Sequence, residues 1–208
     1  ANHKHVKGMC NRNKQDNRTF LVIGGGGAAA TCVETLRQEG YTGHIILATK
    51  ENYPPYDRPK LSKSLAIAAD SLFLRKPEAY KSFDIELQTG KEATALDTAG
   101  KTVTFKDGSK VKFDKVMIAT GGSPRILDLP GKDLSGIHVM RTVEDANALG
   151  KEVKGKKAVV IGTSFIGLES AVVLAGEASS VTVVGRTEPL ANILGVEVGA
   201  AMKKIVLD

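Results

Sequence analysis

With 208 residues and 42% hydrophobic content, the chain can bury one large core or two small ones, which excludes a disordered protein. No stretch approaches the ~18 apolar residues of a membrane span, and residues 1–18 lack the apolar centre of a secretory signal, so we expect a cytoplasmic or mitochondrial protein that is not secreted. The net charge of +6 owes much to this opening segment, and no basic stripe interleaved with aromatics follows, which argues against nucleic-acid binding.

Residues 1–18 are polar and basic, and this composition predicts a flexible linker. Its Cys10 and the later Cys32 are the two cysteines of the chain, and neither belongs to a CxxC pair or to a Cys–His pair at metal-ligand spacing. We therefore expect neither a dithiol relay nor a metal site here, and we interpret Cys32 as a small core residue.

The first folded segment predicts a βαβ unit. A continuous apolar run over 19–23 is typical of a strand buried on both faces, and it leads into glycines and a helix over 28–39. A second buried strand follows over 44–49, so a parallel sheet is implied.

The middle of the chain changes character. A proline-rich stretch from Glu51 precedes a helical segment expected near 65–80. Alternating residues on either side of Asp107-Gly108 predict a small antiparallel β insert over about 102–114, followed by a buried strand over 115–120.

A similar strand–glycine–helix pattern then restarts, with strands over 158–161 and 181–184 and helices over 165–177 and 196–207. About 50 residues are too few for a complete nucleotide-binding sheet, so we expect a piece of a longer protein, inactive by itself. The predicted fold is α/β with two Rossmann-like dinucleotide-binding units, the second incomplete. The predicted domains are the linker 1–18, a first α/β domain 19–150 with the β insert, and a truncated second α/β domain 151–208.

The first glycine turn matches G-x-G-x-x-G/A at Gly24, Gly26 and Ala29. The first glycine makes the tight turn, the second lets the backbone approach a pyrophosphate, and the small third residue lets helix and strand pack closely. Glu51, after the second strand, is the candidate acid for a ribose.

The second turn places Gly162, Ser164 and Gly167 at the same positions, and Ser164 departs from the pattern. Gly185-Arg186 stands where an acid is expected. An arginine there can pair with a 2′-phosphate, so NADPH is at least as reasonable as NADH, although Arg186 is equally well read as a solvated loop cation. Two dinucleotide sites in series indicate electron traffic between two cofactors, which makes 19–150 the FAD-binding domain and 151–208 the NAD(P)-binding domain.

Four stretches carry a resemblance: "PYDRPKLSK" (55–63), "IATGGSPR" (118–125), "MRTVEDANAL" (140–149) and "VVIGTSFIGLE" (159–169). Together they make the sequence similar to the FAD-dependent pyridine-nucleotide oxidoreductases of the ferredoxin-reductase and apoptosis-inducing-factor type. "RPKLSKSL" and "CVETLRQEG" look closest to the Rieske-bearing apoptosis-inducing factor 3 branch. The resemblance runs from about Thr19 onward.

The resemblance implies roles by position. It assigns to FAD the residues Gly24, Gly26, Gly27, Ala28, Glu51, Arg58, Lys63, Ala93, Thr120, Gly121 and Arg141. It assigns to NAD(P)H the second turn, Gly162, Thr163, Ser164, Phe165 and Ile166, to which the spacing adds Arg186.

The resemblance also pairs Lys63 with Glu169 beside the flavin, and we predict these two as the catalytic residues. A cation near the flavin stabilises negative charge as hydride arrives, and a carboxylate fixes the lysine. The alternative is an ordinary ion pair joining two domains. Phe165 would cover the isoalloxazine and gate the nicotinamide, or would simply pack its helix.

The predicted function is hydride transfer from NAD(P)H to FAD, followed by electron transfer to an iron–sulfur (Rieske or ferredoxin) or quinone-type acceptor. Any Rieske domain of the same protein would precede residue 1. The family's second FAD-contacting segment, which follows the nicotinamide domain, does not occur in this sequence. One alternative is a redox signalling protein in which FAD is structural or regulatory, and another is a truncated product without activity.

Overall fold

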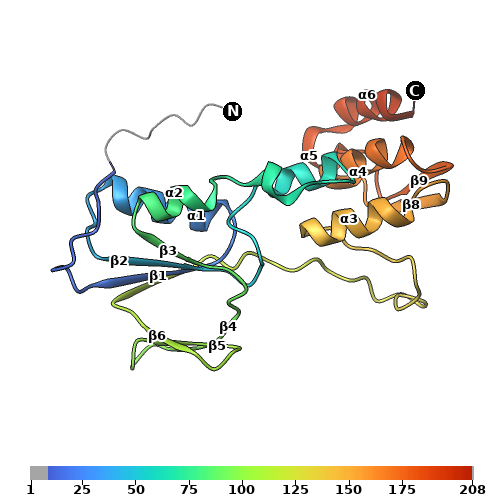
Figure 1. Cartoon of the computed structure of the whole chain (residues 1–208). Coiled ribbons are helices and arrows are strands. Elements are labelled where there is room, and N and C mark those ends of the chain that lie inside the picture. Colours follow the sequence, from blue (N-terminus) through green and yellow to red (C-terminus); the bar gives the residue numbers. More distant parts are fainter. Residues whose placement is uncertain (1–8, 208) are drawn as a thin grey trace. The chain divides into compact units, whose positions relative to one another are not determined.

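The computed structural model describes residues 9–207 and divides into two units (Figure 1). A sheet of four parallel strands lies at the centre of the first unit. They are β1 (Thr19–Ile23), β2 (His44–Ala48), β3 (Ile85–Gln88) and β7 (Lys115–Ile118), in the order β3-β2-β1-β7. The predicted βαβ unit is therefore confirmed. The edge strand β3 was not predicted, because four residues that include two polar side chains give little pattern to read.

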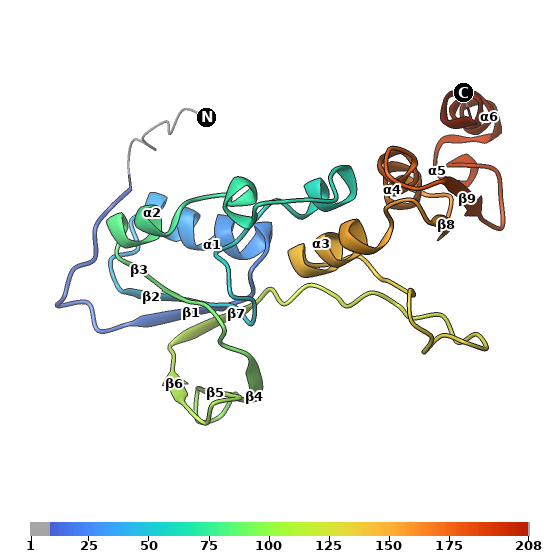
Figure 2. The same cartoon turned by 45° about the vertical axis from the view of Figure 1, so that its right-hand side comes forward.

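Helices cover one face of this sheet. The helices α1 (Gly27–Gln38) and α2 (Pro77–Ser82) lie on the same side of β1 to β3 (Figure 2). Their side chains share a core with the strands, formed by Val22, Ala29, Val33, Tyr41, Ile45, Leu47, Tyr80 and Ile85. Because successive side chains of a strand point to opposite faces, the remaining strand residues need cover on the other side.

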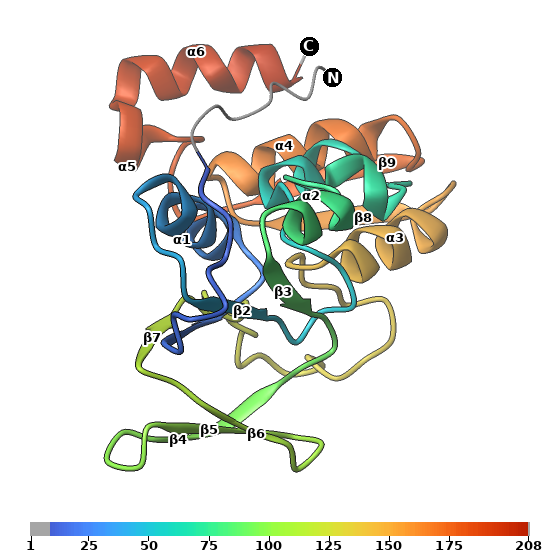
Figure 3. The same ribbon diagram turned by 60° about the vertical axis from the view of Figure 1, so that its left-hand side comes forward.

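That cover is the antiparallel insert, a separate layer in Figure 3. It comprises β4 (Ala93–Asp97), β5 (Thr102–Phe105) and β6 (Lys110–Lys112). Val103, Phe105 and Phe113 pack on the second face of the parallel sheet, against Leu21, Ile23, Ile46 and Ala48. The predicted hairpin around Asp107-Gly108 is confirmed, and β4 adds a third strand to it.

A buried arginine joins α1 to the segments that lead into β2 and β3. Arg37, at the end of α1, has no exposed surface, and its guanidinium donates to four backbone carbonyl groups, those of Tyr41, Gly43, Phe83 and Asp84. Burial lowers the pKa of Arg37. The four acceptors satisfy a charge that would otherwise be costly in the core.

The chain before β1 lies against the same region. Cys10 N donates to Arg37 O at 3.1 Å, and Asn13 N donates to Thr42 O at 2.8 Å. Residues 9–18 are thus irregular in structure but hydrogen-bonded to the first unit, whereas residues 1–8 of the predicted linker lie outside the described residues.

The prediction of one helical segment near 65–80 is wrong. The chain instead forms two short 3₁₀ helices, Arg58–Lys63 and Ala69–Leu72, and then α2. Pro77 stands at the first turn of α2, because proline cannot donate within a helix and is favoured where a helix begins.

The first unit contains the residues up to Asp57 together with Ala69–Gly122. The second unit contains Arg58–Ala68 together with the residues from Ser123 onward. The first α-helix of the second unit is α3 (Val143–Glu152), whose N-terminus carries a capping box between Thr142 and Asp145.

A parallel pair, β8 (Lys157–Ile161) and β9 (Ser180–Val184), follows, connected by α4 (Phe165–Ala175). Two further helices complete the described chain, α5 (Ala191–Leu194) and α6 (Val196–Leu207). The α/β fold with two strand–helix–strand units and an antiparallel insert is confirmed.

Packing in the second unit is one-sided. Ala158, Val160 and Val181 face a core with Leu149 and Val153 of the α3 region and with Leu174 of α4. The opposite face of β8 and β9 exposes Val159, Ile161 and Val184. Within residues 9–207, none of the helices has the length and apolar character of a membrane span.

Candidate dinucleotide sites

The first glycine turn lies at the carboxyl edge of the parallel sheet. Because β1, β2 and β7 run parallel, the residues that follow them, Gly24, Thr49 and Ala119, meet at one edge. Ligands of open α/β sheets bind at this edge. Thr120 and Gly121 continue from the end of β7 and are exposed.

Gly24 fulfils a steric requirement of this turn. Its φ of +146° is one that side chains rarely adopt, and a β-carbon there would lie 2.1 Å from Ala119 O. Glycine is therefore required where β1 and β7 meet the turn, as the motif predicts.

A space for an anion opens next to it. A β-carbon at Gly26 or Gly27 would meet no atom within 4 Å. No side chain caps α1 at Gly26, and its first turn contains no acidic residue. A helix N-terminus with uncapped amides, its positive dipole end and free space in front suits a pyrophosphate, so these residues and Ala28 fit the phosphates of FAD.

The candidate ribose acid, Glu51, is held by two side chains that the sequence pattern did not single out. Tyr56 Oη donates to Glu51 Oε2 at 2.5 Å, and Glu51 N donates to Thr49 Oγ1 at 3.3 Å. The loop after β3 joins this group, because Gly90 N donates to Glu51 O at 2.9 Å, and this loop leads to Ala93 at the start of β4.

The second glycine turn repeats this arrangement. Gly162 has a φ of +128°, and a β-carbon at Gly167 would lie 2.2 Å from Gly162 O, so the small third residue is what lets α4 lie close to β8. Ser164 is the residue before α4, yet its hydroxyl makes no capping hydrogen bond. The first amides of α4 therefore keep no side-chain partner there, and serine does not close the turn against an anion.

Phe165 and Ile166 begin α4 and are 47% and 63% exposed. Both interpretations of Phe165, as a cover for the isoalloxazine and as a packing residue of its helix, stay predictions.

The predicted catalytic pair forms within the second unit. Lys63 Nζ lies 2.8 Å from Glu169 Oε2 and also donates to Pro59 O at 2.9 Å. Sequence reasoning missed Ser62, which is 5% exposed and whose Oγ lies 2.5 Å from the same carboxylate oxygen. The hydrogen bonds from Lys63 and then Ser62 hold the pKa of Glu169 below its usual value.

The proline-rich motif is attached to the second unit at two further points. Arg58 donates to Arg141 O at 2.9 Å, and Asn147 exchanges two hydrogen bonds with the backbone of Ile67. Arg58 therefore contacts the backbone of Arg141, and Lys63 belongs to the same unit. Their predicted contact with an FAD on the first turn remains a prediction.

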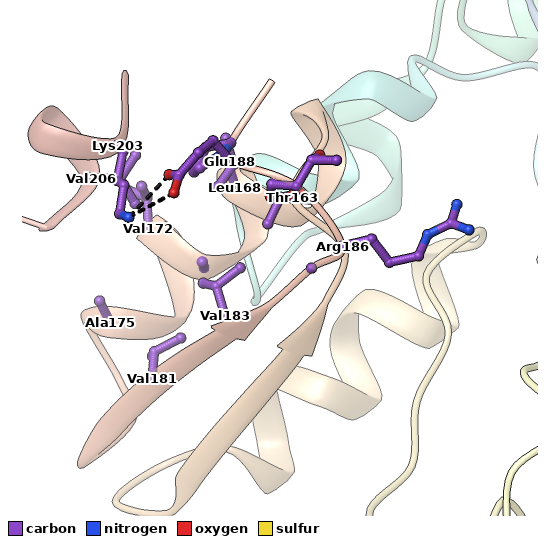
Figure 4. Close-up of a pocket in the computed structure, with 14 residues that line it drawn as sticks. Thr163, Leu168, Val172, Ala175, Val181, Val183, Arg186, Glu188, Lys203 and Val206 are labelled. Carbon is purple, nitrogen blue, oxygen red and sulfur yellow. Dashed lines mark hydrogen bonds and ion pairs between the residues drawn. The ribbon is translucent and has the colours of Figure 1, made fainter. Parts of the chain in front are cut away.

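Arg186 follows β9 beside a cavity of about 620 Å³ between α4, β9 and α6. Figure 4 shows its side chain extending away from the side where Glu188 and Lys203 form an ion pair at 3.0 Å. The cavity walls combine apolar side chains, among them Val172, Val181, Val183 and Val206, with the polar side chains of Thr163, Thr187, Glu188 and Lys203.

Known proteins match this chain over most of its length. The sequence profile of the pyridine nucleotide-disulphide oxidoreductase family matches residues 18–208. Apoptosis-inducing factor 3 of Mus musculus is 42% identical over 186 residues, which cover 89% of this chain and 31% of that protein. The ferredoxin–NAD(+) reductase subunit of the benzene 1,2-dioxygenase system of Pseudomonas putida is 36% identical, over 90% of this chain and 47% of that protein.

A solved structure shares the fold. The covalent putidaredoxin reductase–putidaredoxin complex has a TM-score of 0.83 with 30% identity, over 92% of this chain and 48% of that chain. The chain thus spans less than half the length of each of these three proteins. The resemblance to ferredoxin reductases and apoptosis-inducing factors is confirmed.

Proposed function

Since the chain belongs to the pyridine nucleotide-disulphide oxidoreductase family, we propose that it supplies the cofactor-binding residues of a flavin-dependent NAD(P)H oxidoreductase. Reductases of this family use FAD and NAD(P)H. The observation that carries the proposal is the pair of glycine turns, each with an uncapped helix N-terminus, and the Lys63–Glu169 pair one helical turn beyond the second.

In this proposal the first turn holds FAD through Gly24, Gly26, Gly27 and Ala28, with Glu51 at the adenosine ribose. The second turn holds the nicotinamide nucleotide. Bound together, the two cofactors supply hydride transfer and a route to one-electron acceptors.

The residues of this chain provide charge and orientation. Glu169 and Pro59 O fix Lys63, whose positive charge favours an electron-rich flavin nearby, and Ser62 keeps the carboxylate in place. No acid–base or nucleophilic side chain is required, because the cofactors carry the chemistry.

Relatives suggest the electron acceptor. Ferredoxin–NAD(+) and rubredoxin–NAD(+) reductases are among them, and one related structure holds a reductase joined to putidaredoxin. We extend this to an iron–sulfur acceptor for this protein, a ferredoxin or a Rieske domain of the same full-length chain, in the cytoplasm or the mitochondrion. A quinone-type acceptor is the alternative.

A spectrum tests the proposal. The full-length protein should show flavin absorbance that bleaches within seconds of anaerobic NADPH or NADH addition, and Lys63→Met should slow the bleaching while FAD stays bound. A colourless protein would refute FAD binding at the first turn.

The identity to apoptosis-inducing factor 3 favours a second candidate, a redox signalling protein in which FAD is structural or regulatory. It predicts bound FAD but reduction of ferricyanide by NADPH and NADH no faster than with free flavin. Faster turnover would favour the reductase.

A further inference from the structure

The two glycine turns can be aligned by one hydrogen bond that both contain. Gly24 N donates to Ala48 O, and Gly162 N donates to Val184 O, each at 2.8 Å. In both units the first glycine of the turn is therefore bonded to the last residue of the neighbouring strand. The residues that follow on each side correspond in order: Gly25 with Thr163, Thr49 with Gly185, Lys50 with Arg186 and Glu51 with Thr187.

At the point where turn and strand end touch, the units carry the same two residue types in opposite order. A β-carbon at Gly25 would lie 2.3 Å from Thr49 Oγ1. A β-carbon at Gly185 would lie 2.3 Å from Thr163 Cγ2 and 2.5 Å from Thr163 Oγ1. Each threonine thus fills the space that a side chain on its partner would need, and only glycine leaves its rotamer undisturbed.

Because the threonine stands at the strand end in the first unit and on the turn in the second, its hydrogen-bond partners differ between the two units. In the first unit Thr49, on the strand, accepts from the backbone N–H of Glu51. In the second unit Thr163, on the turn, donates from Oγ1 to Thr187 O at 3.3 Å, and Thr163 O accepts from Leu190 N at 2.9 Å. Thr163 therefore ties the segment 186–190 to the glycine turn.

This segment differs in charge from its counterpart. The position of Glu51 is taken by Thr187, so no carboxylate stands there, and Arg186 precedes it. The nearby carboxylate of Glu188 forms an ion pair with Lys203 at 3.0 Å, and the side chain of Arg186 points away from this pair (Figure 4). A phosphate on a ribose 2′-oxygen would meet a cation at 186 and no acid at 187.

We propose that the Thr163–Gly185 contact is the positioning element that makes the second site prefer a 2′-phosphorylated nicotinamide nucleotide. Thr163 fixes the backbone from which Arg186 projects, and glycine at 185 is what allows it. The inference rests on the proposed function, since it requires that the second turn bind a nicotinamide nucleotide.

Titration calorimetry of the FAD-loaded full-length protein tests the inference, with 2′,5′-ADP and 5′-AMP as probes that differ only in the 2′-phosphate. Thr163→Val keeps the shape of the side chain but removes its hydrogen-bond donor. We expect it to lower the affinity for 2′,5′-ADP by roughly fivefold, the value of one neutral hydrogen bond, with little change in the affinity for 5′-AMP. Thr163→Ser keeps the hydroxyl and should keep the preference.

Coupling gives a second readout. In the native background Gly185→Ala forces Thr163 to rotate, and it should lower the preference for 2′,5′-ADP over 5′-AMP. In the Thr163→Gly background the space of the threonine side chain is empty, and the same substitution should leave the preference unchanged. Equal losses for both probes, or the same effect of Gly185→Ala in both backgrounds, would overturn the inference and leave the proposed function standing. A native protein that binds neither probe would overturn the proposed function itself.

Discussion

Gly167 offers a direct test of the second dinucleotide turn. A β-carbon there would lie 2.2 Å from Gly162 O and 2.9 Å from Gly162 C, about 1.2 Å short of ordinary contact at 3.4 Å from the oxygen. These are backbone atoms of the turn itself, so no rotamer change relieves the clash, and α4 must move away from β8. Overpacking of this kind costs about 1–3 kcal/mol.

We therefore expect Gly167→Ala to lower the free energy of unfolding by about 1–3 kcal/mol. It should also weaken binding of the nicotinamide nucleotide, because the helix N-terminus moves with α4, while FAD binding at the first turn stays unchanged. Urea unfolding followed by circular dichroism, together with nucleotide titration, measures the two effects.

Gly176→Ala, at the residue that caps the C-terminus of the same helix, is the matched control. Its nearest atom, Val173 O, would lie at 3.5 Å, and its backbone has helical angles, so alanine fits and should stabilise by about 0.4–1 kcal/mol. If Gly167→Ala matched this control in both stability and nucleotide affinity, the close approach of α4 to β8 would not be a requirement of the site, and the reasoning would fail.

Two other substitutions probe single groups. Arg37→Met should destabilise the protein by about 3–5 kcal/mol in urea unfolding, because two buried and two partly buried carbonyl groups lose their donor; an unchanged midpoint would show that these hydrogen bonds are dispensable. Glu169→Gln should change the pH dependence of stability. Because the folded pKa of Glu169 is lowered, its contribution is present above the unfolded value of about 4.3 and is lost as pH falls through the folded pKa. The difference between native protein and variant should therefore shrink from pH 6 toward pH 3, and a constant difference would contradict an ionic role for the pair.

Local sequence signals predicted the strands and helices that carry the glycine turns. The bounds of β1 (Thr19–Ile23) and α6 (Val196–Leu207) match the expectation, and those of α1, β2 and α4 agree to within one or two residues. Apolar runs and glycines report such elements because burial on both faces and steric demands at a turn act on neighbouring residues. The family motifs likewise indicated Lys63 and Glu169 before any contact was visible.

Contacts between residues far apart in the chain were decided by the tertiary structure. The short segment 58–68 joins the second unit through bonds to Arg141, Asn147 and Glu169, all of them eighty or more residues away. The hydroxyl of Ser62 meets a carboxylate in the same way, and Thr163 meets Gly185 across two strand ends. None of these follows from periodicity, because a pattern along the chain reports which face a residue occupies, and packing alone selects the partner on that face.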